Sequence, residues 1–363
     1  MAANCSLNSS DVTYFNATDL QSIKRSPEDR FFVSILLPAI AICGLFINAA
    51  FVYVVYKVPG MRTITNLYLV QLSISDMGTA FFLTFESVHA YLLSPEYNLK
   101  QIPGIGCSFY ALGIYVFYLS GVNFIFIVTI ERYFAICRPM KHRMFRGTSR
   151  ARDTSIVCWI IGLMMASPLL VPFNEITICA ENPDASTAHD TWLVFQTCEP
   201  ACIWCYYFVI TFDTAQFWTV FIINVTIYVA VITKLRKRAS NTNLPVSSTT
   251  QQVSKDVTLM LIVNGIAFFI LLGPCEAWNI AQLINKYAGV SIISTEILPV
   301  LFWLSRICTS MNFVINPLIY AGTNRRYRRA FQQVLCCSSS EKNHKADTNG
   351  ENIKSVSGAD TSK

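Results

Sequence analysis

The chain has 363 residues, of which 53% are hydrophobic and 14% are charged, and its mean hydropathy is +0.42. A typical soluble domain has about 25% charged residues, so this composition excludes an ordinary water-soluble protein. It indicates a membrane protein, for which we expect lipid partners and no nucleic-acid partner.

Seven stretches are long and apolar enough to cross a membrane. A spanning helix needs roughly 20 mostly apolar residues. The runs are continuous rather than alternating every second residue, which favours helices over barrel strands. The predicted spans are 31–56, 66–92, 105–130, 154–173, 202–232, 257–283 and 296–321. The predicted fold is therefore an all-α membrane protein with a seven-helix bundle over residues 31–322 and no separate soluble domain.

The distribution of Lys and Arg predicts the orientation of this bundle. The loops after the first, third and fifth predicted helices carry thirteen of them, and the opposite loops carry two. We therefore expect a multi-pass plasma-membrane protein with its C-terminus in the cytoplasm. Residues 1–30 then form an extracellular tail, in which Asn4, Asn8 and Asn16 begin N-x-[ST] sequons and are expected to be glycosylated.

Cysteines at the predicted outer end lie where the oxidising exterior permits a disulfide bond. Cys107 lies at the start of the third helix, and the candidates for its partner are Cys179, Cys198, Cys202 and Cys205. Sequence spacing does not fix the pairing. The other cysteines in the apolar spans are expected to be small packing residues.

Several motifs follow one another in a fixed order along these helices. Asn48 lies in "CGLFINAAFVYVV", Asp76 ends "NLYLVQLSISD", Glu131 begins "ERY", and "NPLIY" spans 316–320. Further positions are Cys107, twenty-five residues before Arg132, together with Trp159, Pro168, Tyr228 and Pro274. This ordered set resembles the rhodopsin-like (class A) G-protein-coupled receptors over residues 31–337. The resemblance implies a disulfide from Cys107 to the second outer loop and an amphipathic eighth helix over 323–337, palmitoylated at Cys336 and Cys337.

Charge at Glu131 and Arg132 is tolerated because they lie at the membrane boundary, and an inert interfacial pair is the simpler interpretation. The resemblance adds that Glu131 holds Arg132 until a heterotrimeric G protein binds. It also assigns the switch and the coupling surface to Tyr133, Pro139, Met140, Tyr228, Asn316, Pro317 and Tyr320. The tail 338–363 is polar and expected to be disordered, with Ser and Thr residues for a receptor kinase and arrestin.

A carboxylate deep in an apolar helix is costly, so Asp76 is expected to be functional. Together with Asn48, Asn312 and Asn316, the resemblance implies a pocket for a sodium ion as allosteric modulator, the one cofactor expected. A purely structural hydrogen-bond network is the alternative. Gly121 and Phe313 depart from the family pattern at this place.

Two further departures concern the path from ligand to switch. Val220 stands where the family usually has proline, and Leu272 stands where it often has tryptophan. We expect repacking of Phe268 and Leu272 to take over the role of that tryptophan.

Two sequence features exclude classes of ligand. Ile114 stands where amine receptors have aspartate, and the seventh span lacks the lysine that retinal requires. The predicted pocket contains Glu86, His89, Ile114, Tyr115, Leu272, Glu276, Asn279, Trp303 and Arg306. Its opposite charges either pair with one another or meet the charges of a peptide.

"ERYFAICRPM" and "MRTITNLYLVQLSISD" are most similar to the neuropeptide branch, particularly receptors for ghrelin, motilin, neuromedin U and thyrotropin-releasing hormone. We therefore predict a neuropeptide ligand, with a lipid or other small molecule as the alternative. A seven-helix transporter is a second class of function, but no inverted repeat supports it. The four scattered His have no metal-ligand spacing, so neither an enzyme nor a metal site is expected.

Overall fold

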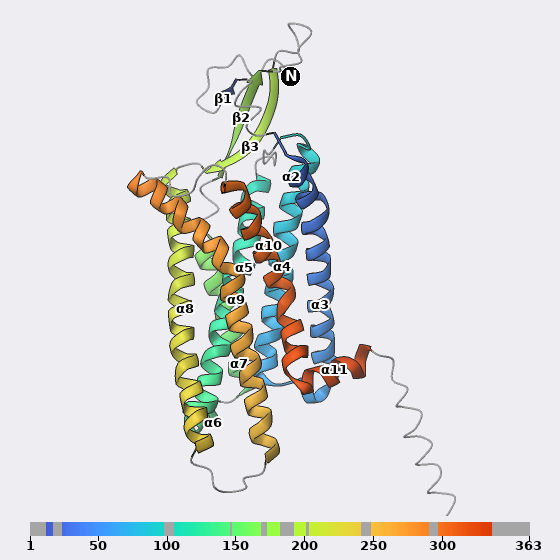
Figure 1. Ribbon diagram of the computed structural model, residues 1–363, viewed down its shortest axis with the longest axis vertical. Coiled ribbons are helices and arrows are strands. Elements are labelled where there is room, and N and C mark those ends of the chain that lie inside the picture. Colours follow the sequence, from blue (N-terminus) through green and yellow to red (C-terminus); the bar gives the residue numbers. More distant parts are fainter. Residues whose placement is uncertain are drawn as a thin grey trace, which may run out of the picture.

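The computed structural model describes residues 12–16, 24–97, 105–145, 147–167, 173–181, 192–200, 203–240, 248–289 and 297–335. Seven long helices form one bundle in this part of the chain (Figure 1). They are α3 (Leu37–Lys57), α4 (Ile64–Leu93), α5 (Ile105–Cys137), α7 (Thr148–Ala166), α8 (Ile203–Ser240), α9 (Ser248–Ala288) and α10 (Leu298–Thr323). The predicted seven-helix fold is confirmed. Below we call the two ends of the bundle the α11 end and the sheet end.

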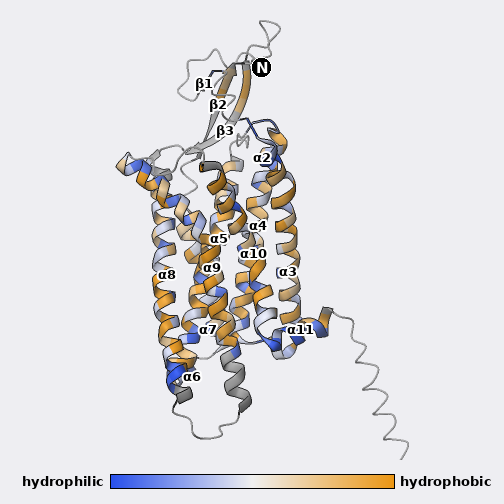
Figure 2. Cartoon of the chain, in the orientation of Figure 1, coloured by the Kyte–Doolittle hydropathy of each residue, from blue (hydrophilic) through white to orange (hydrophobic). Residues whose placement is uncertain are grey.

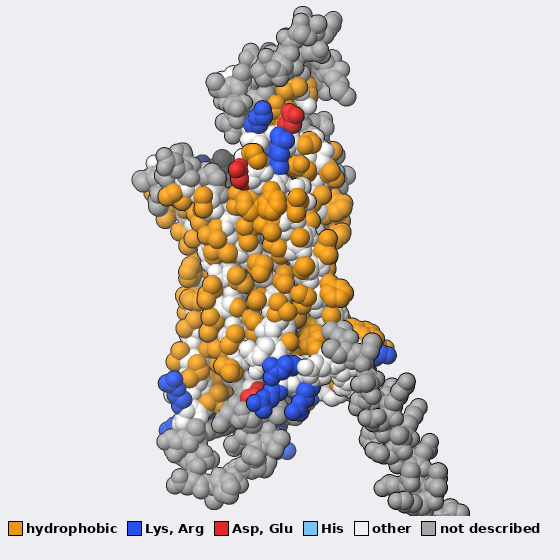
Figure 3. All heavy atoms as spheres, turned by 45° about the vertical axis from the view of Figure 1, so that its right-hand side comes forward, with side chains coloured by type: hydrophobic (Ala, Val, Ile, Leu, Met, Phe, Trp, Pro, Cys, Tyr) orange, Lys and Arg blue, Asp and Glu red, His pale blue; other side chains and the backbone are white. Residues whose placement is uncertain are grey.

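Hydrophobic residues occur along the length of the bundle helices (Figure 2), and their side chains cover the face of the bundle that Figure 3 shows. Residues such as Ile42 and Phe46 are 66% and 73% exposed, which a soluble protein would avoid over so large a surface. By length and hydropathy, four described helices qualify as membrane spans: Pro27–Lys57, Gly106–Cys137, Ile210–Lys237 and Asp256–Ala288. The remaining three, α4, α7 and α10, carry more polar residues, several of which face the bundle interior.

The first helix begins earlier than predicted. Its N-terminal turns are α2 (Pro27–Phe31) and the π-helix η2 (Phe32–Leu36), which continue into α3. Ser26 and Asp29 form a capping box, in which the side chain of each accepts a hydrogen bond from the backbone N–H of the other. The helix therefore begins at Pro27, before the predicted start of the bundle at residue 31, because the cap lies at Ser26.

Other helix ends also differ from the predicted spans. The predicted fourth span, 154–173, is wrong at its C-terminal end, because Phe173 begins a strand, and α7 itself runs from Thr148 to Ala166. Pro168 disfavours helix at the residue before it. By contrast, α8 and α9 extend beyond their apolar spans, because Lys, Arg and Gln are good helix formers. Hydropathy thus marks the membrane boundary rather than the helix end.

A small sheet lies at the sheet end of the bundle and was not predicted (Figure 1). Its strands are β1 (Val12–Phe15), β2 (Phe173–Glu181) and β3 (Trp192–Pro200), in the order β1-β2-β3. β2 pairs antiparallel with β3 and parallel with β1. Phe195 packs edge to face on Tyr97, which follows α4, with ring centroids 5.3 Å apart. This contact holds the hairpin β2–β3 against the bundle.

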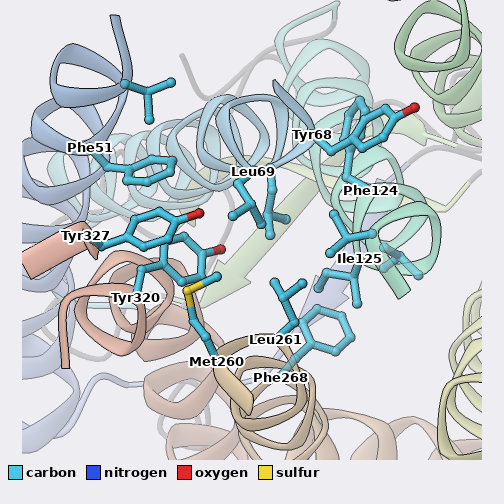
Figure 4. Packing of buried hydrophobic residues seen from close by; sticks show 14 of the residues in the cluster. Phe51, Tyr68, Leu69, Phe124, Ile125, Met260, Leu261, Phe268, Tyr320 and Tyr327 are labelled. Atoms are coloured by element: carbon cyan, nitrogen blue, oxygen red, sulfur yellow. The ribbon is translucent and has the colours of Figure 1, made fainter. Parts of the chain in front are cut away.

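Two short elements lie at the opposite end. α6 (Pro139–Phe145) follows α5, and α11 (Arg325–Leu335) follows α10 and runs across the bundle (Figure 1). The main hydrophobic core extends toward this end (Figure 4). There, Phe51 of α3 packs on Tyr320 of α10 and Tyr327 of α11, with ring centroids 5.2 and 6.2 Å away. The predicted eighth helix, 323–337, corresponds to α11, while residues 336 and 337 lie outside the described residues.

One interhelical hydrogen bond compensates for a break in α10. Pro317 has no N–H, so the carbonyl of Phe313 lacks its usual helical donor. Asn48 of α3 supplies one: its Nδ2 atom donates to the Phe313 oxygen at 2.6 Å. A Cβ atom at Gly44, one turn earlier, would lie 3.3 Å from Val314 Cγ2 of α10, a tight contact, so glycine favours the close approach of the two helices. Because an unsatisfied carbonyl in hydrocarbon costs several kcal/mol, Asn48 fixes α3 against α10.

The first prediction tests this compensation. Asn48→Leu should lower the free energy of unfolding by about 1–3 kcal/mol, because the Phe313 carbonyl loses its donor. The same substitution should cost much less in a Pro317→Ala background, where the backbone N–H of residue 317 can bond to that carbonyl. Thermal unfolding of the four purified proteins in detergent measures both effects. Ser34→Ala, which removes an exposed hydroxyl bonded to Arg30 O, serves as control; an equal loss in both backgrounds would contradict the mechanism.

Candidate functional site

A cluster of polar side chains joins three helices at the α11 end. Arg132 Nε lies 2.9 Å from Glu131 Oε2, and both side chains are about seven-eighths buried. Thr65 of α4 bonds to both: Arg132 Nη2 donates to its hydroxyl oxygen, and this hydroxyl lies 3.2 Å from Glu131 Oε2. His142 Nε2 of α6 lies 3.2 Å from the other carboxylate oxygen. The Glu131 carboxylate therefore holds Arg132 between α4 and α6, and we call these four residues the Arg132 cluster.

On the opposite side of the α11 end, Tyr228 links α8 to α5 and α9. Its hydroxyl lies 3.0 Å from Thr129 Oγ1 of α5 and donates to the Leu261 carbonyl of α9 at 3.4 Å. Gly265 provides the space, since a Cβ atom there would lie 2.4 Å from the Tyr228 hydroxyl. Thr129 stands one turn before Arg132. The Tyr228 hydroxyl thus ties α8 and α9 to the helix that carries the Arg132 cluster.

The other predicted switch residues surround this end. Tyr320 is fully buried, and Tyr327 beside it donates from its hydroxyl to Asn66 Oδ1. Tyr133 packs on Phe134 with ring centroids 5.7 Å apart. Pro139 begins α6, and Met140 is 74% exposed. Lys and Arg side chains gather over the same end (Figure 3). Met140 therefore exposes an apolar side chain within a basic surface.

Asp76 lies in a polar layer in the middle of the bundle. Asn316 Nδ2 donates to Asp76 Oδ2 at 2.6 Å, and Asp76 is 5% exposed. The Oδ1 atoms of Asn48, Asn312 and Asn316 are buried without a hydrogen-bond partner in the described part of the chain. A carboxylate together with free amide oxygens is a ligand set that suits a hard cation. The predicted polar residues thus fit a sodium ion chemically.

Gly121, a departure from the family pattern, has a structural reason. A Cβ atom at Gly121 would lie 2.9 Å from Ser75 Oγ, and Ser75 donates to the Phe117 carbonyl. Glycine therefore allows α5 to approach α4, and the neighbouring helix supplies a hydroxyl. Ser75 lies within the motif that ends at Asp76, but the motif does not indicate its contact with α5.

Two predicted pocket residues belong to hydrophobic clusters. Ile114 packs against Ala41, Leu83 and Phe313, and Leu272 is 1% exposed within the main core. Phe268, expected to repack with Leu272, lies in the same core with its ring 6.4 Å from Phe217. Both pocket assignments followed from position in the family pattern, which does not reveal how deep a side chain lies.

The remaining predicted pocket residues lie on α4, α5, α9 and α10 toward the sheet end. His89 Nδ1 of α4 lies 3.3 Å from the Tyr110 hydroxyl of α5, whereas Glu86 and Tyr115 are half-buried. Glu276 is buried with Thr214 and Asn279 beside its carboxylate. Tyr110 and Thr214 were not predicted, because no sequence motif marks them.

Trp303 and Arg306 have neighbours that the sequence did not indicate. Trp303 Nε1 donates to Asp29 Oδ1, and its ring stacks on Phe32 with centroids 4.8 Å apart. The guanidinium of Arg306 lies 5.5 Å from the centroid of the Phe302 ring. Arg306 and Glu276 therefore form no ion pair with each other. Internal pairing of pocket charges, one of the two predicted alternatives, does not occur between these two residues. The first helical turns instead form one wall of this region.

Arg25 anchors the chain just before α2. Its Nε atom donates to the carbonyls of Ser94 and Tyr97 at 3.2 and 2.9 Å. Burial lowers the pKa of its guanidinium, but this group stays charged at neutral pH because an arginine pKa starts far above 7. The contact fixes the entry to the first helix against the end of α4.

Covalent features were predicted mainly for the outer end. Cys107 and Cys179 are each disulfide-bonded in the structure, whereas Cys43, Cys137, Cys158, Cys275 and Cys308 are free thiols. The Asn16 side chain is exposed. Asn4, Asn8, Cys202, Cys336, Cys337 and the tail 338–363 lie outside the described residues, as do the side chains of Cys198 and Cys205.

This arrangement agrees with comparison to known families. Residues 47–320 match the family described as 7 transmembrane receptor (rhodopsin family). The chain belongs to this family: it is a G-protein-coupled receptor, a multi-pass protein of the plasma membrane, and not an enzyme.

Individual relatives are distant but extend over most of the chain. Somatostatin receptor type 1 of Mus musculus is 24% identical over 324 residues, which cover 89% of this chain and 76% of the relative. The Allatostatin-A receptor of Bombyx mori is 24% identical over 312 residues, covering 84% and 80%. Somatostatin receptor type 5 of Rattus norvegicus is 22% identical over 308 residues, covering 84% and 77%.

The second prediction tests the close approach at Tyr228. Gly265→Ala should displace the Tyr228 ring, break its bonds to Thr129 and Leu261, and lower the free energy of unfolding by about 1 kcal/mol. Gly273→Ala is the matched control in the same helix, because nothing lies within 4 Å of a Cβ there. It should cause no loss, since alanine is the better helix former. Equal thermal midpoints for both purified variants would contradict this role of Gly265.

Proposed function

We propose that this receptor binds an extracellular neuropeptide at the sheet end and activates a heterotrimeric G protein at the α11 end. The observation that carries the proposal is the Arg132 cluster, which holds a basic residue at the end where basic loops gather. Since Lys and Arg favour the cytoplasmic side, that end faces the G protein. The similarity to somatostatin and allatostatin-A receptors supports a peptide ligand, and the sequence motifs favour the ghrelin and motilin receptor group.

Activation is a shift between two populations. The agonist stabilises the form that it binds more tightly, and the G protein reads this form from the cytoplasm. Pro274 and Pro317 lack the backbone N–H that a helix needs, so they interrupt the hydrogen bonding of α9 and α10 and provide places at which these helices can bend. Opening at the α11 end requires the Tyr228 hydroxyl to release α9 and Glu131 to release Arg132.

The most informative experiment is a screen of amidated and basic neuropeptides on cells that express the chain, with calcium and cAMP as readouts. A peptide response should be accompanied by nucleotide exchange on a purified G protein. Silence to all peptides together with a response to a lipid would overturn the ligand class. Solute flux without nucleotide exchange would overturn the receptor mechanism and favour a transporter.

The third prediction concerns the Arg132 cluster. Glu131→Gln removes the charge that holds Arg132. Because about 1.4 kcal/mol changes a population ratio tenfold, loss of this interaction should raise agonist-independent nucleotide exchange several-fold. Asp153→Asn is the control, because Asp153 forms an exposed ion pair with Arg152 at 3.6 Å. Unchanged basal exchange in Glu131→Gln, at equal surface expression, would contradict the role of Glu131.

Sodium is proposed as an allosteric ligand of the layer around Asp76. The buried oxygens of Asn48, Asn312 and Asn316 support this proposal. As a fourth prediction, sodium chloride should raise the thermal midpoint of the purified receptor above that in choline chloride. The Asp76→Asn variant should lose this difference; a difference of the same size in the variant would exclude Asp76 as the ligand.

Several modifications and partners complete the proposal. Cys107 and Cys179 are proposed to bond to each other, which would join α5 to β2. Glycosylation is proposed at Asn4, Asn8 and Asn16, and palmitoylation at Cys336 and Cys337. The basic residues of α11 suit anionic lipids, and the Ser and Thr residues of the tail suit a receptor kinase and arrestin.

A further inference from the structure

Two carboxylates lie near each other on α8 and α9 toward the sheet end. Asp213 lies on α8 and Glu276 on α9, close enough for their charges to interact. Tyr118 of α5 lies within the electrostatic influence of both. These three residues come from three different helices of the bundle. We call Asp213 and Glu276 the acidic pair.

Helical spacing directs the acidic pair toward the interior. Asp213 stands one turn from Phe217, which is buried, and Glu276 stands one turn from Leu272, which is also buried. The ring centroids of Phe217 and Phe268 lie 6.4 Å apart beneath them. The acidic pair therefore lies above an apolar floor inside the bundle rather than facing lipid.

The charge of the acidic pair lacks a matching cation. Glu276 is 1% exposed, and its Oε2 atom is buried without a hydrogen-bond partner in the described part of the chain. Thr214, itself 8% exposed, lies beside this carboxylate. A buried carboxylate, Glu276, beside a half-buried one, Asp213, is unfavourable without a basic partner, so the acidic pair favours a cation from elsewhere or a shared proton.

Basic side chains near this end are engaged elsewhere. Arg306 lies against the Phe302 ring. Lys286, at the end of α9, lies with Nζ 5.8 and 5.3 Å from the ring centroids of Trp204 and Tyr207 of α8. Both cations thus have aromatic neighbours, and neither forms an ion pair within 4 Å of the acidic pair in the described residues.

We propose that Asp213 and Glu276 form a subsite for a cationic group of the ligand, the guanidinium or ammonium of a basic peptide side chain. A cation between the two carboxylates replaces their mutual repulsion by two attractions, and a guanidinium can donate to both at once. Ile114 leaves α5 without an acidic residue at the amine-receptor position. The subsite lies instead on the α8 and α9 side, and it rests on the proposed function as a peptide receptor.

The test uses the purified full chain in detergent and N-acetyl-arginine amide as probe. N-acetyl-citrulline amide is the matched control probe, because citrulline has nearly the shape of arginine without its charge. The arginine probe should raise the thermal midpoint in a dose-dependent manner, and the citrulline probe should not. Asp213→Asn and Glu276→Gln should each weaken the arginine probe at least about tenfold, as expected when a buried charge partner is removed.

Glu96→Gln is the control variant, since Glu96 is an exposed carboxylate near the same end, and it should bind the arginine probe like the unmodified chain. A cooperative thermal transition in each variant verifies folding. No shift with the arginine probe, an equal shift with citrulline, or unchanged affinity in both acid variants would overturn the subsite.

Failure of the subsite and failure of the proposed function give different results. Peptide-driven nucleotide exchange that is equally potent in Asp213→Asn and Glu276→Gln would keep the receptor function and overturn the subsite. Selective arginine binding that both variants abolish, without nucleotide exchange for any peptide, would keep the subsite and overturn the function.

Discussion

The fold depends on one constraint: inside the hydrocarbon layer no water can replace a lost backbone hydrogen bond. Pro317 removes such a bond from α10, and Asn48 of α3 restores a donor to the Phe313 carbonyl. That single contact holds the two helices in register. It also keeps Asn316, the neighbour of Pro317, within hydrogen-bond distance of Asp76 on α4. A bend that an opening receptor needs is thereby made compatible with a stable bundle.

The contacts at the α11 end are individually weak. The threonine and tyrosine hydroxyls each contribute about 0.5–1.5 kcal/mol, and the mostly buried pair of Glu131 and Arg132 contributes about 1.5–3 kcal/mol. Together they favour the closed form by an amount that a ligand can overcome through differential affinity of a few kcal/mol. The polar layer around Asp76 lies between the α11 end and the acidic pair. It connects the helices there, so the bundle can respond as a unit. Weak contacts at the α11 end and strong contacts in the middle suit a receptor that switches without unfolding.

The sequence predicted the helices because continuous hydropathy is set by the membrane, and it predicted Glu131, Asp76 and Asn316 because ordered motifs mark them. It did not predict the sheet, because residues 174–201 were expected only as an outer loop, and no strand pattern or membrane signal marked them. Thr65, His142 and Asp29 were missed since their roles come from partners distant in the chain. Ile114 and Leu272 were assigned to the pocket by position, but their depth depends on how neighbouring helices pack.

The central claim, that Glu131 holds the α11 end closed, is tested most directly by a distance measurement. Spin labels at the exposed positions Arg138 and Leu259, with the free cysteines replaced, report the separation of α5 and α9 by double electron–electron resonance. Without ligand, Glu131→Gln should populate a longer distance that is rare in the unmodified receptor, and a nucleotide-free G protein should populate the same distance in both. Identical distance distributions for the two receptors without ligand would contradict the claim.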